Sequence, residues 1–149
     1  MRLSEYLSQD LVLSDLRATA KADVLAELTA SLAALTPPVD PDEAVAVLLE
    51  RESLGTTGIG DGIAIPHGKL PGLTQIVVVA GRSIQGVEFD SLDFKPCHIF
   101  FLVLAPEQVA GLHLRILAHI SRLLKDDSFR RSFISAPNSQ ALWDLLNDT

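Results

Sequence analysis

The sequence predicts a layered α/β or α+β domain in which helices cover a small β-sheet. Apolar residues recur with helical spacing in the first third of the chain and again after residue 112. Between these helices lie two short apolar runs, 75–80 and 98–104, that are rich in β-branched and aromatic residues. Such strands and helices bury their apolar faces against one another in layers. These patterns leave open whether the sheet is parallel, antiparallel or mixed.

Length and composition fit a single domain spanning residues 1–149, because no linker is long enough to divide the chain. The longest unbroken apolar run, Ile99 to Ala105, is far shorter than the roughly 18 residues that a membrane span needs. The N-terminus lacks a signal-peptide core, and one cysteine excludes an internal disulfide and a multi-cysteine metal site. We therefore expect a cytoplasmic protein without membrane insertion.

The charge distribution argues against a nucleic-acid-binding protein. The formal net charge is −7, and the basic residues are scattered, with Arg130 and Arg131 as the only adjacent pair. Nucleic-acid binders usually show a basic face or stripe. An acidic body can still hold a local cationic pocket for an anionic group.

The first long helix is predicted at roughly Ala20 to Leu35. Its leucines recur at intervals of three and four, with charged residues on the other faces. Thr36 to Asp40 contains two prolines and ends this helix.

A second helix is expected to begin after Asp40, which suits the N-cap. Pro41 fits the first helical position, and Glu43 stands where a capping-box carboxylate belongs. Gly55 is a natural C-terminal stop. Arg51 therefore lies in the last turn, beside a glycine-rich loop.

The second half of the chain is predicted as two buried strands followed by three helices. The strands are Gln75 to Ala80 and His98 to Leu104, and the connection Gly81 to Pro96 is read as partly extended with one edge strand. A helix from Leu112 to Lys125 carries His113 on its apolar face, with Ile116, Leu117, Ile120 and Leu124. A short helical segment at 126–134 and a last helix capped by Asn138 complete the chain.

The stretch from Arg51 to Lys69 is the candidate functional site. It begins with an arginine, ends with a lysine, and places His67 between Pro66 and Gly68. Histidine titrates near neutrality and forms covalent intermediates. If the group transferred is phosphoryl, the protein needs only to position it and neutralise its charge.

Two kinds of group are candidates for that neutralisation. The backbone N–H groups of a phosphate-binding loop around Gly58, Gly60 and Gly62 form one candidate. The guanidinium of Arg51 is the other, as a planar donor matched to phosphate. His113 is a third catalytic candidate, because it is a titratable ring on an inward-facing helical face.

Each of these residues also has a purely structural explanation. A lone histidine before a glycine is more often a loop residue than a nucleophile, Arg51 can complement the negative end of its helix, and His113 can be a core-edge histidine bonded to a carbonyl. Cys97 behaves most simply as a small buried hydrophobe, and His98 begins a strand. The Gly58–Gly62 loop lacks the strand–helix context of a dinucleotide-binding motif.

Taken together, these residues resemble one family, the type-2 IIA components (EIIA) of the phosphoenolpyruvate-dependent sugar phosphotransferase system. The matching block is Arg51-Glu52, Gly55, Thr57-Gly-Ile-Gly60 and Gly62-Ile-Ala-Ile-Pro-His-Gly-Lys69. Supporting similarity continues in 86–90, 100–106, 113–118 and 122–124, so it covers nearly the whole chain. The residues of this block look most like those of the nitrogen-regulatory branch. Cys97-His98 departs from the family pattern without touching the motif.

The resemblance implies a mixed β-sheet flanked by helices on both faces, with no metal and no organic cofactor. It implies that His67 accepts a phosphoryl group from a histidine phosphocarrier protein, that Arg51 stabilises the phosphohistidine, and that His113 lies beside it as a second active-site histidine. The partners implied are this carrier as donor and an EIIB subunit or regulatory target proteins downstream.

Two classes of function follow from this. The first is a phosphotransferase component that passes the group on, either of nitrogen-regulatory type or, as the alternative, a sugar-specific EIIA of the fructose or mannitol class donating to an EIIB in sugar uptake. The second is a non-catalytic binding module whose interactions are controlled by phosphorylation of His67, because a phosphoryl group adds about two negative charges.

Overall fold

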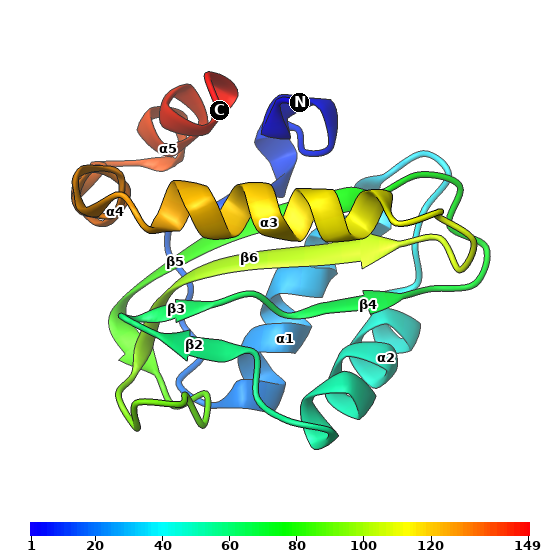
Figure 1. Cartoon of the computed structure of the whole chain (residues 1–149), viewed down its shortest axis with the longest axis horizontal. Coiled ribbons are helices and arrows are strands. Elements are labelled where there is room, and N and C mark those ends of the chain that lie inside the picture. The colour runs from blue at the N-terminus through cyan, green and yellow to red at the C-terminus, as the bar shows by residue number, and fades with distance from the viewer.

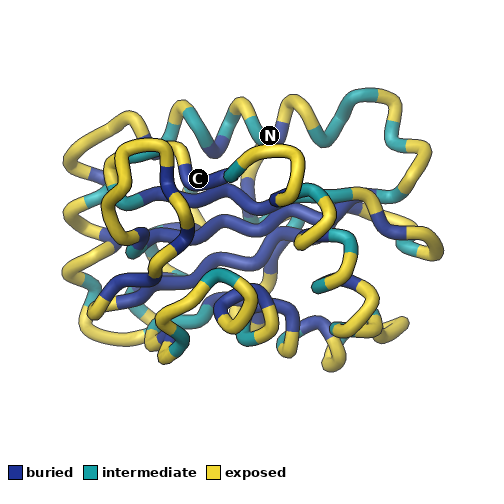
Figure 2. The backbone as a smooth tube through the Cα atoms, turned by 90° about the horizontal axis from the view of Figure 1, so that it is seen from below, coloured by how far each residue is buried: buried dark blue, intermediate teal, exposed yellow.

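The computed structural model describes residues 1–149 as a six-stranded mixed sheet between two layers of helices. Figure 1 shows α3 (Leu112–Leu124) crossing the front of the sheet, while α1 (Lys21–Ala30) and α2 (Pro41–Ser53) lie behind it. Seen from below, buried strands run between these two layers (Figure 2). The mixed sheet with helices on both faces is therefore confirmed.

The sheet is organised around β6 (Cys97–Ala105), which pairs antiparallel with β5 (Val77–Val87) on one side. On its other side β6 pairs parallel with two short strands in succession, β3 (Ile63–Ala64) and β4 (His67–Lys69). The outer strands are β1 (Val12–Leu13), parallel to β5, and β2 (Gly58–Gly60), antiparallel to β3. The residues that follow the predicted strand 75–80 thus belong to the sheet as well.

That continuation corrects the expectation for Gly81 to Pro96. The segment does not leave the sheet at residue 81; β5 runs on to Val87, with a register shift between Arg82 and Val87. Gly86 makes the shift possible, because its φ of +94° disfavours any other residue and an added Cβ would lie 2.9 Å from Cβ of Pro96.

The N-terminal helices follow the predicted order with shorter bounds. The helix expected from Ala20 to Leu35 is α1 followed by a 3₁₀ turn, η3 (Ser31–Ala34). In α2, the carboxylate of Asp40 accepts from the backbone N of Asp42 at 3.0 Å, whereas the capping-box bond expected from Glu43 does not form. Two further 3₁₀ turns, η1 (Leu3–Glu5) and η2 (Gln9–Leu11), precede β1.

The three C-terminal helices agree with the sequence pattern. Ile116, Ile120 and Leu124 of α3 are buried, as expected for its apolar face. The segment predicted at 126–134 is α4 (Asp127–Ser135), and α5 (Ser139–Asn147) is capped by Asn138, whose side chain accepts from the backbone N of Ala141 at 2.9 Å. None of the helices combines the length and the apolar character that a membrane crossing requires.

Buried apolar residues form one cluster of 37 side chains, built mainly from β5, β6 and the inner faces of the helices. One cation lies within it: Arg82 is 5% exposed and donates to the carbonyl oxygens of Ser14 and of Phe133, Ile134 and Ala136 at the end of α4. Burial raises the pKa of the Cys97 thiol to about 11, which agrees with its expected role as a small buried hydrophobe.

Candidate functional site

A cavity of about 390 Å³ opens at the edge strand β4, between α2 and the start of α3. Three of the predicted site residues, Arg51, His67 and His113, line it together. The other lining residues come from the same elements and from β6: Val47, Glu50, Leu54, Gly68, Lys69, Val103, Ala105 and Leu117. The structure therefore brings together Arg51 and His113, which are 62 positions apart in the sequence.

His67 is held by the backbone on both sides. Its strand pairs with β6 at Val103, whose N–H donates to the carbonyl of Pro66 at 2.9 Å. The ring nitrogen Nδ1 lies 2.8 Å from the carbonyl oxygen of Ile65. Because a carbonyl oxygen only accepts, Nδ1 carries the proton of the neutral ring and Nε2 carries the lone pair. The ring is half-buried, and the contact with Ile65 fixes the direction in which Nε2 points.

Gly68 has a packing role that the sequence did not suggest. A Cβ added there would lie 2.7 Å from Cγ1 of Val47 on α2, so only glycine lets the helix come this close to β4. The same approach brings Arg51, one helical turn after Val47, to the rim of the cavity.

The guanidinium of Arg51 donates from Nη1 to the carbonyl of Gly55 at 2.9 Å, which closes the end of α2. This bond agrees with the purely structural explanation of Arg51, in which it complements the C-terminal end of its helix. Arg51 nevertheless also lines the cavity. Leu54, the C-cap of the helix, is 82% exposed on the same rim.

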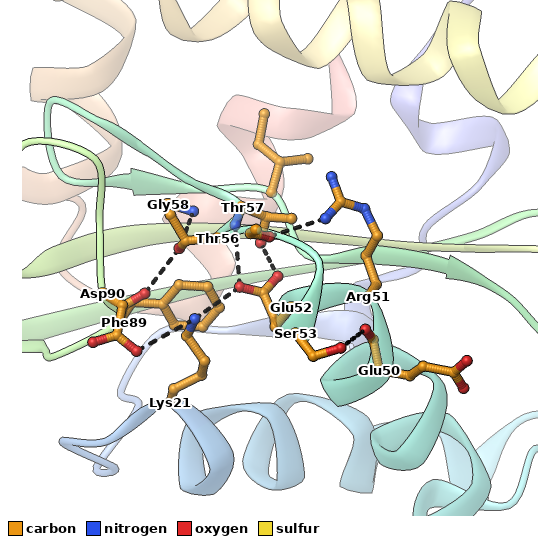
Figure 3. A network of polar contacts seen from close by, with 12 residues as sticks. Lys21, Glu50, Arg51, Glu52, Ser53, Thr56, Thr57, Gly58, Phe89 and Asp90 are labelled. Carbon is orange, nitrogen blue, oxygen red and sulfur yellow. Dashed lines mark hydrogen bonds and ion pairs between the residues drawn. The ribbon is translucent and has the colours of Figure 1, made fainter.

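A buried ion pair next to Arg51 anchors the end of α2 (Figure 3). The carboxylate of Glu52 lies 3.0 Å from Nζ of Lys21 in α1 and accepts from both the backbone N and the hydroxyl of Thr57. Lys21 also lies 3.5 Å from a carboxylate oxygen of Asp90 and 4.8 Å from the ring centroid of Phe89. Glu52 thereby joins the end of α2 to α1 and to the loop after α2, and Lys21 extends the connection to the 88–90 segment.

His113 enters the cavity from the first turn of α3. Its Nδ1 is buried without a hydrogen-bond partner. Burial lowers the pKa of His113, and the nearby charges of Lys69 and His67 lower this pKa further. The ring is therefore neutral near pH 7, with a buried polar nitrogen that no protein group satisfies.

Lys69 and Glu50 were not predicted as site residues, although the position of Lys69 in the sequence pointed to the site. Lys69 stands two positions after His67 on the same strand, a spacing that places both side chains on one side. With Arg51 and Lys69 against the single carboxylate of Glu50, the ionised side chains in the cavity sum to +1 in a chain of net charge −7.

The three glycines predicted as a phosphate-binding loop do not line this cavity. Gly58 and Gly60 belong to strand β2, and the carbonyl of Gly62 accepts from the backbone N–H groups of His98 and Ile99. Their backbone is thus used by the sheet and by the start of β6. Sequence adjacency to His67 was a poor guide here, because Pro66 and β3 separate the loop from the histidine.

His98 is structural in this fold, as expected. Its Nδ1 donates to the carbonyl of Ser83 at 2.8 Å, which ties the start of β6 to β5. The ring packs against the glycine at position 86, where an added Cβ would lie 3.0 Å from Cε1.

Comparison with known proteins agrees with this geometry. The family model described as "Phosphoenolpyruvate-dependent sugar phosphotransferase system, EIIA 2" matches residues 5–149. The chain belongs to this family. The resemblance seen in the Arg51–Lys69 block is thereby confirmed.

Individual relatives include both branches. The chain is 39% identical over 147 residues to a nitrogen regulatory protein of Bradyrhizobium diazoefficiens, covering 98% of this chain and 95% of that protein. It is 39% identical over 107 residues to the fructose-specific EIIA component of Haloferax volcanii, covering 72% and 70% of the two chains. The crystal structure of the nitrogen regulatory protein IIA-Ntr of Neisseria meningitidis superposes with a TM-score of 0.87 at 28% identity, covering 97% and 98%.

Proposed function

We propose that His67 carries a phosphoryl group, received from a phosphohistidine on a histidine phosphocarrier protein and passed on or kept as a regulatory signal. The observation that carries the proposal is the bond from Nδ1 of His67 to the carbonyl of Ile65, which leaves Nε2 as the nucleophile in a cationic cavity. Family membership supplies the transfer chemistry, since EIIA components belong to a phosphotransferase system.

In this step Nε2 of His67 attacks the phosphorus atom, and the donor's N–P bond breaks as the new one forms. The donor nitrogen keeps the bonding electron pair, and the proton on Nδ1 stays shared with the Ile65 carbonyl. Arg51 and Lys69 supply the positive charge that the phosphoryl oxygens need, so the protein contributes position and electrostatics rather than covalent chemistry.

His113 fits a complementary role as a neutral ring that gains charge when the phosphoryl group arrives. Its low pKa is set first by burial and then by the positive charge of Lys69 and the charge of His67. A phosphoryl dianion on His67 places negative charge beside His113. This negative charge raises the pKa of His113 and lets the protonated ring donate to a phosphoryl oxygen.

The nitrogen-regulatory reading is favoured over sugar uptake by the relatives named above, of which the Bradyrhizobium protein covers more of this chain than the Haloferax one. In this reading the phosphorylation state of His67 controls binding to target proteins. For the sugar-specific alternative the acceptor is an EIIB subunit. The mannitol IIA of Escherichia coli, which has the same fold (TM-score 0.77, 19% identity), is known in complex with phosphorylated IIB.

The test is phosphorylation of the purified chain with radiolabelled phosphoenolpyruvate, the first enzyme of the system and its phosphocarrier. We expect one acid-labile phosphoryl group per chain on the wild type and none on His67→Ala. His98→Gln serves as the matched control, because that ring is structural, and should label normally. Equal labelling of His67→Ala, or an unlabelled wild type, would refute the transfer role.

Acceptor assays then separate the two branches. Transfer of the label to a purified EIIB of the fructose or mannitol class supports sugar uptake. A label that stays on the chain, together with a target whose affinity differs between the phosphorylated and unphosphorylated forms, supports regulation.

A further inference from the structure

The loop between β5 and β6 displays two large apolar side chains to solvent. Phe94 is 91% exposed and Leu92 is 67% exposed. The φ of Phe94 is +60°, in the left-handed region that sterics disfavour for a bulky side chain. Neither burial nor backbone preference explains an aromatic residue at this position, so it is a candidate for a role outside the fold.

Hydrogen bonds within the loop hold the backbone at Phe94. Its backbone N–H donates to the carbonyl of Ser91 at 3.0 Å. The carboxylate of Asp93 accepts from the backbone N of Lys95 at 3.1 Å, which closes the turn around the exposed ring. An anchor on a backbone that is already ordered loses less conformational freedom on binding.

The same loop lies against β2, the outermost strand of the sheet. The backbone N of Leu92 donates to the carbonyl of Gly58 at 2.9 Å, and the backbone N of Asp61 donates to Asp93 at 3.2 Å. Ile59 of β2 is 47% exposed. We call Ile59, Leu92 and Phe94 the edge patch; none of the three lines the His67 cavity.

Acidic residues outnumber basic ones on the two segments that form the edge patch. The two segments that form it, 58–62 and 88–96, contain four carboxylates, those of Asp61, Glu88, Asp90 and Asp93, against one base, Lys95. All four acids are exposed residues, although Asp90 also lies 3.5 Å from Lys21. A second copy of the chain would bring the same acids face to face, which disfavours self-association through this patch.

We propose that the edge patch docks another protein, one that offers an apolar pocket for Phe94 bordered by lysine or arginine side chains. Rigid aromatic anchors at the centre of an interface carry a large share of binding energy. Opposite charges around them speed association and select the partner. The docking site is separate from the phosphoryl-transfer cavity, so the chain can engage this partner while His67 is free to react.

Two substitutions probe the patch without disturbing the fold, and a third serves as their control. Phe94→Gly removes the anchor and places at φ +60° the residue that accepts it most readily. Asp61→Asn removes one acid and keeps a residue type that tolerates the φ of +56° found there. Ile84→Ala is the matched control, because Ile84 is 61% exposed but lines a different hollow with Asp15 to Arg17.

The experiment places the photo-reactive residue p-benzoylphenylalanine at position 94 of the full chain in the living cell. The cross-linked protein is identified by mass spectrometry and purified, and its affinity for the unmodified chain is measured. We expect a different protein rather than a second copy, with Kd weakened about tenfold or more by Phe94→Gly and unchanged by Ile84→Ala. Association should slow several-fold with Asp61→Asn and with added salt.

Three outcomes of the cross-linking and affinity measurements would overturn the proposal: no adduct, an adduct only between two copies of the chain, or a captured protein that binds Phe94→Gly as tightly as wild type. The rate of phosphoryl transfer to His67 distinguishes this site from the transfer site. Phe94→Gly should be phosphorylated at the wild-type rate; a slower rate would assign the patch to the phosphocarrier and refute a separate docking surface. If His67 is not labelled at all, the proposed transfer function fails, and the cross-linking and affinity measurements still decide the docking proposal.

Discussion

Gly68→Ala tests whether the close approach of α2 to β4 sets the geometry of the site. The added methyl would lie 2.7 Å from Cγ1 of Val47, closer than real Cβ contacts come, so the Val47 side chain, the helix or the strand has to move. Overpacking of this kind costs about 1–3 kcal/mol. Reduced freedom of the unfolded chain returns about 0.4–1 kcal/mol. We therefore expect a net loss of about 1–2 kcal/mol in the free energy of unfolding.

The effect on phosphoryl transfer should exceed the effect on stability. Arg51 lies one turn beyond Val47, so a displacement of α2 from β4 also displaces the guanidinium from His67. A shift of about 1 Å in a reacting arrangement can lower a rate by about 100-fold. We expect transfer to slow by about 10- to 100-fold while the fold is retained.

Urea unfolding followed by circular dichroism and the initial rate of labelling at His67 measure the two effects. The decisive comparison is the double variant Gly68→Ala/Val47→Ala, in which the clashing methyl is gone. It should recover stability with a coupling energy of about 1–2 kcal/mol and recover most of the rate. If Gly68→Ala is as stable and as fast as wild type, or if the losses of the two single variants simply add, the packing explanation is wrong.

Three further predictions concern buried polar groups. Glu52→Gln should lower the free energy of unfolding by about 3 kcal/mol in urea denaturation, because it removes the buried carboxylate beside Lys21 and leaves only the exposed one of Asp90. Glu52→Gln/Lys21→Met should recover much of this loss; a neutral single variant would contradict the role of the ion pair. Arg82→Met should lower the melting temperature by about 5–10 °C, since it leaves the carbonyls at the end of α4 without donors, whereas Arg131→Met on the exposed face of α4 should be nearly neutral. The pKa of His113 is lowered in the folded state, so the unfolded chain binds the proton first and stability should be full above pH ~6.5 and fall as pH drops from there toward the folded pKa; His113→Gln should flatten this slope in pH-dependent denaturation, and an unchanged slope would contradict it.

The helices were predicted well because the residues that begin and end a helix are its immediate neighbours in the sequence. Pro41 and Gly55 bracket α2, and Asn138 caps α5, so each boundary follows from a few adjacent side chains. The inward position of His113 likewise follows from its spacing to Ile116 and Ile120. A periodic pattern contains this information without knowledge of any distant segment.

Strand pairing was less predictable, since it depends on partners far away in the chain. The length of β5 is set by β6, which supplies hydrogen bonds as far as Val87, and the residues of 81–87 do not show this by themselves. The glycines between 58 and 62 look like an anion-binding loop, but their backbone groups are engaged by β3 and β6. The role of Gly68 was also hidden, because the group it accommodates belongs to Val47 on another element.

The place of the site follows from the same long-range pairing. Strand β4 pairs only with β6, so its other side is a free edge where a half-buried histidine can meet a second protein. Helices α2 and α3 lie on opposite faces of the sheet, and each reaches this edge with one end, which brings Arg51 and His113 to the histidine from two sides. A histidine in the middle of the sheet would lack access to a second protein, whereas the edge of β4 gives that access and lies within reach of both helices. For that reason we expect changes that move α2 or α3 to affect phosphoryl transfer before they affect folding.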